Sequence, residues 1–290
     1  PLAWSSAASD VYKRQGIIAG GVSQINMLVD TILASLLPTG SPSWLYVSDR
    51  LMQLPLGIFA IAIGTVILPR LSSLFITKDR IAFSNTLDWS MRLILLISIP
   101  AVIGLVMLAE PIILTLFERG AFNSYDSLQA SYSLIALAGG LVAFMLIKIL
   151  TPSFFARQEP KKPMYVALIS MVLNAVLAWL LGFNLGYGHV GLALASSISA
   201  FFTAMTLLFL LKREKIYESS KGWIVFWIRL SIASIVLILF LVYFNKEVSD
   251  LREFTNFGRI VYLLKMVILG IGLYLLALRL SGLRLKDFIN

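Results

Sequence analysis

The side chains in this sequence that could do chemistry are a few polar groups set inside long apolar stretches. Asp30 lies in the first stretch, and Ser23 and Asn26 fall within about 60° of it around a helix. Hydrocarbon cannot solvate a carboxylate, so this face must look into protein or water. Asp30 either binds a cation or carries a proton, or it makes a helix–helix hydrogen bond. Asn174, in a later stretch, is the candidate to share an ion site with it.

A second polar face lies where the next apolar stretch begins. Arg50, Gln53 and Gly57 share this face, and it continues to Gly64. A guanidinium binds phosphate through a planar fork of donors, and glycine leaves room for a ligand. The face therefore predicts a site for an anionic substrate, with Asp49 orienting Arg50 or pairing with another cation. The alternative is a structural Asp–Arg pair near the membrane interface.

Lys148 is a further charged candidate inside an apolar stretch. Its long stem either reaches substrate or extends toward the lipid headgroups. For Arg229 and Lys265, which lie nearer the ends of their stretches, headgroup contact is favoured. The sequence has no Cys and a single His, His189, which excludes disulfides, thiol chemistry and His- or Cys-based metal sites. It also shows no Ser–His–Asp set, P-loop or paired carboxylates facing a substrate, so we expect no enzyme and no bound cofactor.

Long apolar runs must hold these side chains in place. Of the 290 residues, 59% are apolar and 13% are charged, whereas a soluble domain is about one quarter charged. Ordinary soluble enzymes, disordered chains and nucleic-acid-binding modules are therefore excluded. Each run can span about 30 Å of hydrocarbon, and none alternates as a strand does. We predict an all-α, polytopic integral membrane protein with eight transmembrane helices, at 16–37, 44–69, 91–117, 129–156, 163–186, 189–211, 223–244 and 259–281.

The net charge of +9 comes mostly from one set of loops. With the N-terminus inside, sixteen of the 24 Lys and Arg residues lie on inner segments and four on outer ones, as the positive-inside rule requires. Both termini are therefore predicted to be cytoplasmic. Residues 78–92 mix apolar and charged side chains, and we expect a short amphipathic helix on the inner leaflet or a solvated loop. Residues 1–15 match nothing that follows and are interpreted as non-native or a fragment edge.

Three stretches resemble one known family. They are GVSQINMLVDTILASLLPTGSPSWLYVSDRLMQLPLGIFAIAIGTVILPRLS (21–72), FERGAFNSYDS (117–127) and KILTPSFFARQEPKKP (148–163). They resemble the MurJ (MviN) family of lipid II flippases, which belongs to the MOP exporter superfamily. The resemblance covers about residues 16–290, and residues 43–72 are the most specific part of it.

The resemblance implies a division of the chain. Members of the family have two six-helix lobes around a cationic cavity, followed by two further helices. On this pattern 16–211 is the second lobe, 212–222 a cytoplasmic linker, 223–281 the two-helix extension and 282–290 a cytoplasmic tail. The chain would then be a fragment whose partner is the missing N-terminal lobe of the same protein.

The resemblance also implies an activity, namely moving lipid-linked peptidoglycan precursor to the outer leaflet of the bacterial cytoplasmic membrane by alternating access. Its partners would be lipid II and membrane lipids, with no nucleic acid. Arg50 matches the family's cavity arginine in the second lobe, and Asp49 and Ser43 match neighbouring positions. Gln53 stands where some relatives have Glu. An ion at Asp30, either Na⁺ or H⁺, or the membrane potential would drive the cycle.

Three rival interpretations stay open. The first is another exporter of the same superfamily, either a polysaccharide-precursor flippase or a cation-coupled drug antiporter, although a drug antiporter should favour acids over Arg50 in its cavity. The second is a membrane enzyme acting on polyprenyl phosphates, which would need clustered acids for Mg²⁺. The inner acids are instead scattered along the sequence, at Asp79, Asp88, Glu159, Glu214 and Glu218. The third is a non-transporting membrane scaffold.

Overall fold

The computed structural model describes residues 28–245 and 248–283. All regular elements within these ranges are helical, including residues 28–35. The elements are α2 (Ser41–Pro55), η1 (Leu56–Ile61), α3 (Ala62–Ile76), α4 (Arg80–Met107), α5 (Ala109–Phe117), α6 (Ser124–Ala156), α7 (Lys161–Trp179), η2 (Leu180–Asn184), α8 (Gly188–Arg213), α9 (Trp223–Phe244), α10 (Val248–Glu253) and α11 (Asn256–Leu280).

Seven helices in the described part of the chain are long and apolar enough to cross a membrane. This confirms the predicted all-α, polytopic fold class. The first predicted run, 16–37, falls mostly on residues outside the described ranges, as do Ser23, Asn26 and the segment 1–15. The short helix α10 lies in a stretch for which the sequence had suggested only a loop.

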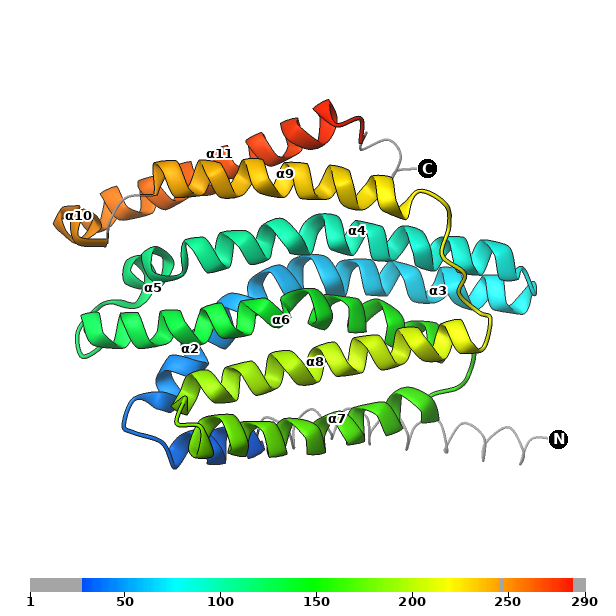
Figure 1. Cartoon of the computed structure of the whole chain (residues 1–290), viewed down its shortest axis with the longest axis horizontal. Helices are drawn as coiled ribbons and strands as arrows, with labels where there is room; N and C mark the ends of the chain where they lie inside the picture. Colours follow the sequence, from blue (N-terminus) through cyan, green and yellow to red (C-terminus); the bar gives the residue numbers. More distant parts are fainter. Residues whose placement is uncertain (1–27, 246–247, 284–290) are drawn as a thin grey trace.

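The helices lie side by side, with α6 at the centre (Figure 1). It packs against α2, α3, α4, α5 and α8. The turns and loops fall at two ends. The linker end carries 77–79, 157–160 and 214–222, and the opposite end carries 118–123, 185–187 and the connection from α9 to α11. The segments predicted to be on the inner side therefore meet at the linker end.

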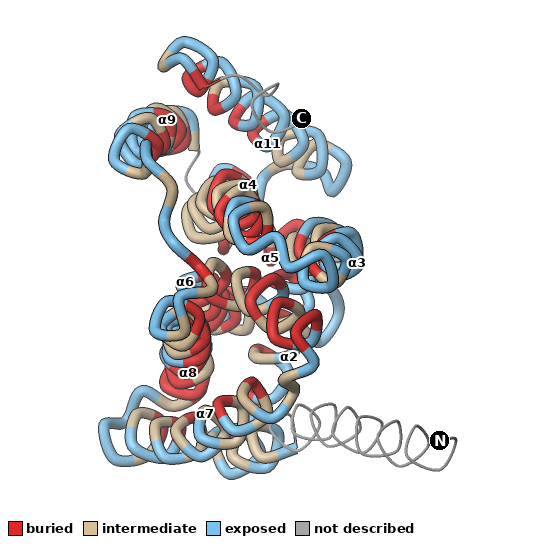
Figure 2. The backbone as a smooth tube through the Cα atoms, turned by 90° about the vertical axis from the view of Figure 1, so that its right-hand side faces the viewer, coloured by how far each residue is buried: buried red, intermediate tan, exposed pale blue. Residues whose placement is uncertain are grey.

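The last helices form a pair beside the main body. Viewed end-on, α9 and α11 lie next to each other beyond α4 and α5 (Figure 2). Helix α4 is buried on both sides. Its Leu87 and Ile94 belong to the core around α6, while its Leu96 packs with Leu230 and Leu237 of α9.

Residues 78–92 do not form a separate surface segment, so that prediction was wrong. Asp79 caps the N-terminus of α4, where its carboxylate accepts a hydrogen bond from the N–H of Ala82 at 2.9 Å. The helix then continues without interruption to Met107. Phe83, Leu87 and Met91 recur every four residues and are buried in the main core.

The run 91–117 was also wrong as a single helix, because it breaks after Met107. Pro111 has no N–H to donate to the carbonyl of Met107, four residues earlier. The side chain of Asn245 donates to that carbonyl at 3.3 Å.

A second proline of α4 shows the same arrangement. Pro100 leaves the carbonyl of Leu96 without its helical donor. The hydroxyl of Tyr274 in α11 donates to it at 2.8 Å. The last helix pair therefore docks on α4 where prolines leave backbone carbonyls without a helical hydrogen bond. Its side chains donate hydrogen bonds to these carbonyls, which would be costly to leave without a donor in a membrane.

Helices α2, η1 and α3 form one continuous span of 36 residues. At 1.5 Å per residue it is about 54 Å long, more than the hydrocarbon thickness of about 30 Å. The π-helical turn η1 follows directly after Pro55. Proline loosens a helix because it lacks an N–H, which accounts for the π-turn at this point.

Candidate functional site

The predicted polar face is an exposed side of α2. The residues that recur on it at helical spacing and are exposed are Ser43, Tyr46, Arg50, Gln53 and Gly57. The opposite side is buried and is held to α6 by hydrogen bonds. Ser48 donates to the carbonyl of Ala130 at 2.8 Å, and the indole of Trp44 donates to Asp126 at 2.9 Å. The buried side fixes the orientation of the helix and leaves the polar face open.

Arg50 has an unusual environment for a charged group in an apolar protein. Its guanidinium lies over the ring of Tyr46, 4.8 Å from the centroid. It forms no ion pair with any carboxylate among residues 28–245 and 248–283. Asp49 accepts a hydrogen bond from Gln53 at 2.5 Å instead. The structural Asp–Arg pair that the sequence left open is not formed between Asp49 and Arg50.

The two glycines of the predicted face differ. Gly57 has open space where a Cβ would stand. At Gly64 a Cβ would lie 3.0 Å from the carbonyl oxygen of Lys148 on α6. Pro152 cannot donate to that carbonyl. Gly57 thus leaves open space on the same face as Arg50, about two helical turns further along, whereas Gly64 lets α3 pack closely on α6.

Lys148 is exposed, as a substrate contact or a headgroup contact would require. It lies beside Gly64, fourteen residues beyond Arg50 along the α2–α3 span. That is about 21 Å of helix. Lys148 therefore does not join the cluster formed by Arg50, Asp49 and Gln53.

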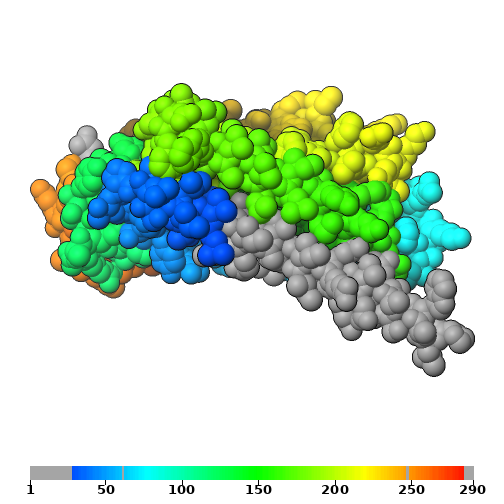
Figure 3. Space-filling view, turned by 90° about the horizontal axis from the view of Figure 1, so that it is seen from below, coloured from blue at the N-terminus to red at the C-terminus, as the bar shows by residue number. Residues whose placement is uncertain are grey.

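The two candidates for an ion site lie together. The side-chain amide of Asn174 in α7 donates to the carboxylate of Asp30 at 2.9 Å. Ser196 of α8 donates to the amide oxygen of Asn174 at 3.5 Å, and Asn174 is only 1% exposed. The carboxylate of Asp49 is close enough to that of Asp30 to interact with it electrostatically. Asp30, Asn174 and Ser196 are far apart in the sequence but form one polar site between three helices. Figure 3 shows the face of the molecule on which the first described residues, in blue, lie beside α7 and α8, in green.

Sequence reasoning missed a cluster at the linker end. Arg157 lies 2.9 Å from Glu159 and 2.7 Å from Glu214, and Lys162 lies 2.6 and 2.5 Å from the same two acids. Burial opposes the ionisation of Glu214, but the hydrogen bonds from Lys162 and Arg157 outweigh it and lower the pKa of this carboxyl. Both acids are occupied by cations, so they form no open Mg²⁺ site of the kind that a polyprenyl-phosphate enzyme needs.

Asp88 forms a second cluster with the linker. It accepts hydrogen bonds from the hydroxyl of Tyr217 at 2.7 Å, from Ser220 at 2.5 Å and from the indole of Trp223 at 2.7 Å. Arg92 lies 2.9 Å from the same carboxylate. Burial and the neighbouring Asp88 raise the pKa of the Tyr217 hydroxyl. The linker is thus attached to α4 just before α9 begins.

Comparison with known proteins decides the family. A family model described as "Lipid II flippase MurJ" matches residues 14–263. The chain belongs to the MurJ family. It is 42% identical over 273 residues to the probable lipid II flippase MurJ of Vibrio cholerae, covering 92% of this chain and 50% of that protein. The corresponding protein of Haemophilus influenzae is 42% identical over 272 residues, covering 91% and 52%. The chain spans about half the length of the curated MurJ relatives it matches.

Solved structures agree with this family. A lipid II flippase MurJ in an inward closed conformation superposes with a TM-score of 0.75 at 30% identity, over 93% of this chain and 52% of that one. A MATE transporter in its straight conformation gives 0.62 at 17% identity, over 95% and 64%. The second likeness concerns the fold alone. MurJ proteins are transporters, and this chain is a multi-pass membrane protein of their family.

Proposed function

We propose that the chain is half of a lipid II flippase and that the exposed face of α2 lines its substrate cavity. The observation that carries the proposal is Arg50, a charged group inside a membrane-spanning helix that forms no ion pair with a carboxylate in the described part of the chain. A bare guanidinium facing lipid is costly, so this face should look into a polar cavity. The MurJ relatives are about twice as long as the region matched here, and their other half would close that cavity.

The chemistry of the face suits a lipid pyrophosphate. The guanidinium of Arg50 replaces hydration that the phosphates lose in the membrane, through paired N–H donors. Gln53 and Ser43 add hydrogen-bonding groups on the same face, and Gly57 leaves room beside them. The polyprenyl tail stays in the bilayer while the headgroup crosses. Rocking of the two lobes exposes the cavity to each side in turn.

Asp30 and Asn174 are the proposed coupling site for Na⁺ or H⁺. A cation beside Asp30 would offset its repulsion from Asp49, which holds Gln53 on the substrate face. Ion binding and the substrate face are thereby linked through one pair of carboxylates. Asp30→Asn in the full-length parent protein should abolish any dependence of transport on an ion gradient. Unchanged ion dependence in this variant would eliminate the site. Transport that does not respond to ion replacement in the wild type would leave the membrane potential as the driving force.

The linker end is proposed to face the cytoplasm of the bacterial inner membrane. Among the described residues, it gathers most of the Lys and Arg side chains (Figure 1). Since the sequence has no cysteine, one cysteine at Lys78 or at Asn123 provides a unique label at either end. A membrane-impermeant thiol reagent added to intact cells, whose outer membrane has been made permeable, should label the Asn123 variant alone. Labelling of the Lys78 variant alone would reverse the orientation.

The substrate role is tested by complementation of a flippase-depleted bacterium. The full-length parent gene carrying Arg50→Ala should fail to restore growth while reaching the membrane at the normal level. Arg70→Ala, which removes an exposed arginine near the linker end, is the matched control and should restore growth. Full rescue by Arg50→Ala would refute the role of this face.

A further inference from the structure

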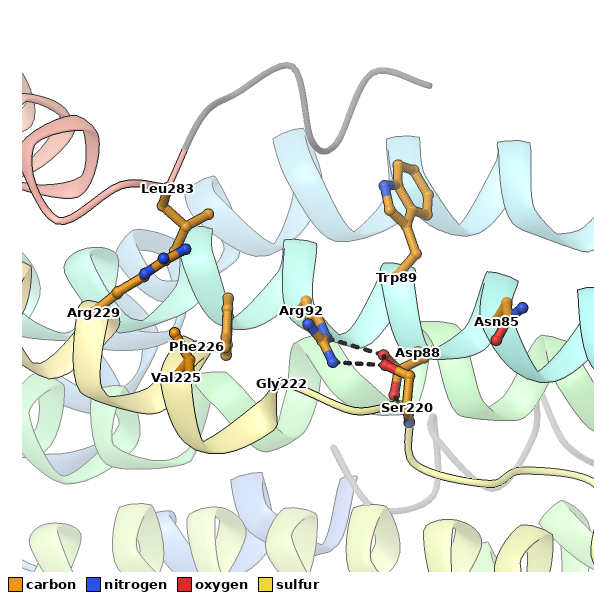
Figure 4. A pocket seen from close by; sticks show the side chains of 10 residues that line it. All are labelled: Asn85, Asp88, Trp89, Arg92, Ser220, Gly222, Val225, Phe226, Arg229 and Leu283. Carbon is orange, nitrogen blue, oxygen red and sulfur yellow. Dashed lines mark hydrogen bonds and ion pairs between the residues drawn. The ribbon is translucent and has the colours of Figure 1, made fainter.

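A cavity of about 490 Å³ lies at the linker end, between the start of α9 and α4 (Figure 4). Its walls come from α4, the linker, α9 and Leu283, which follows α11. Figure 4 shows the side chains that define it, which include Asp88, Trp89, Arg92, Ser220, Phe226 and Arg229. None of these residues belongs to the face of Arg50 or to the site of Asp30 and Asn174.

The cavity is cationic. Arg92 pairs with Asp88 at 2.9 Å and also donates to Ser220 at 2.7 Å. Arg229 donates to the carbonyl of Gly282 at 3.2 Å and forms no ion pair with a carboxylate of the described residues. Two guanidinium groups thus face one carboxylate, leaving a net positive charge. The N-terminus of α9 lies at the same place, with Gly222 as its N-cap and no side chain capping it, which adds partial positive charge.

Tryptophans around the cavity indicate that it lies at the depth of lipid headgroups. Trp89 lines it, and Trp223 and Trp227 stand at the start of α9. Tryptophan gathers at the membrane–water interface. Arg229 is six residues into α9, or about 9 Å along the helix axis. The side chain of Arg229 can therefore reach a phosphate bound near the start of α9.

An apolar stripe leads from the cavity along α9. Exposed side chains recur on one side of this helix at a spacing of three and four residues, at Val225, Ile228, Ile232, Ile235 and Leu239. Val225 also lines the cavity. A molecule with a phosphate in the cavity could therefore lay an acyl chain along this side of α9.

We propose that this cavity binds the phosphate headgroup of an anionic phospholipid, with Arg92 and Arg229 as its ligands and the apolar stripe of α9 along one acyl chain. The charge, the depth and the stripe each favour a membrane phospholipid over a soluble anion. Arg92 belongs to α4 and Arg229 to α9, so the bound phosphate also bridges the main body and the last helix pair. Basic pockets between helices at the cytoplasmic side of a membrane recognise such headgroups.

The proposal is tested by lipid retention. The full chain is reconstituted in nanodiscs of phosphatidylcholine and phosphatidylglycerol, and native mass spectrometry measures the ratio of the two lipids that stay bound. The wild type should prefer phosphatidylglycerol, and Arg229→Gln should lower that preference about fivefold. Arg279→Gln, which removes an exposed arginine from the last turn of α11 outside the cavity, should leave it unchanged.

Two further experiments test the role of Arg92 and distinguish a lipid phosphate from a soluble one. Because Arg92 also holds Asp88, its test variant is Arg92→Lys, which keeps the charge and should weaken the preference less than Arg229→Gln does. Excess inorganic phosphate or pyrophosphate should not displace the retained phosphatidylglycerol; displacement would reassign the cavity to a soluble anion. An unchanged preference in Arg229→Gln, or an equal loss in Arg279→Gln, would overturn the proposal.

Discussion

Arginine has opposite surroundings on α2 and at the linker end. Arg157 is buried and contacts two carboxylates, those of Glu159 and Glu214. Arg50 is exposed, lies over the ring of Tyr46 and forms no ion pair with a carboxylate among the described residues. A guanidinium whose donors are occupied fastens helices together, whereas one with free donors can take up a ligand. The same residue type therefore has a structural role in one region and a proposed substrate role in the other.

The largest expected effect on stability is at Arg157. Arg157→Ala leaves Glu159 and Glu214 sharing Lys162 alone, and should lower the free energy of unfolding by about 2–3 kcal/mol because both acids are partly buried. Chemical unfolding in detergent measures it. Arg213→Ala, at an exposed position one residue before Glu214, should change stability little. Equal effects of the two variants would remove the distinction between paired and unpaired arginines.

The same cluster predicts a pH dependence. The pKa of Glu214 is lowered in the folded protein from its ordinary value of 4.5, so its contribution to stability is present above that value. The contribution is lost as the pH falls further through the folded pKa. Unfolding at a series of pH values should therefore show a loss below about pH 4.5 that is smaller in Glu214→Gln. An identical acid profile in both proteins would show that Glu214 contributes nothing.

A smaller effect is expected at Tyr274, whose hydroxyl satisfies the carbonyl that Pro100 releases. Tyr274→Phe should cost about 1 kcal/mol of stability, since one buried hydrogen bond is lost. Tyr243→Phe is the control, because Tyr243 is 82% exposed on α9. If the Tyr243 variant lost as much stability, the docking of the last helix pair would not depend on this bond.

The smallest effects are expected at the two glycines. Gly57→Ala should raise stability by up to about 1 kcal/mol, since alanine favours helix and the space is open. Gly64→Ala should lower stability, because its Cβ would stand 3.0 Å from the carbonyl of Lys148. Thermal unfolding of both variants should thus give shifts of opposite sign. A destabilising Gly57→Ala would show that the face is not open at Gly57, and a stabilising Gly64→Ala would show that α3 does not pack closely on α6 there.

The sequence predicts the spans and the intramembrane polar residues well, for a physical reason. A polar group in hydrocarbon needs a partner or a cavity, so Asp30 and Asn174 could be singled out before their contact was seen. Apolar length likewise identifies the helices. It cannot locate their ends, because residues 78–92 use charged side chains on a helix that continues into the membrane.

The linker-end clusters could not be predicted in the same way. Arg157 and Glu214 are 57 positions apart and meet only because α6 and α8 end side by side. In a polar loop a charged side chain can be hydrated by water without a partner, so its presence in the sequence does not indicate an ion pair. The carbonyls of Leu96 and Met107 are different, because Pro100 and Pro111 show already in the sequence that these carbonyls lack a helical donor. The side chains that donate to them instead are known only from the fold.

The most direct test of the substrate role is lipid II transport by the full-length parent protein in proteoliposomes, measured for Arg50→Gln, Arg50→Lys and the wild type. The account predicts that Arg50→Gln loses transport and unfolds at the same temperature as the wild type, while Arg50→Lys keeps partial transport, because a point charge replaces the planar fork. Wild-type transport by Arg50→Gln, or loss of transport explained by loss of folding, would contradict it.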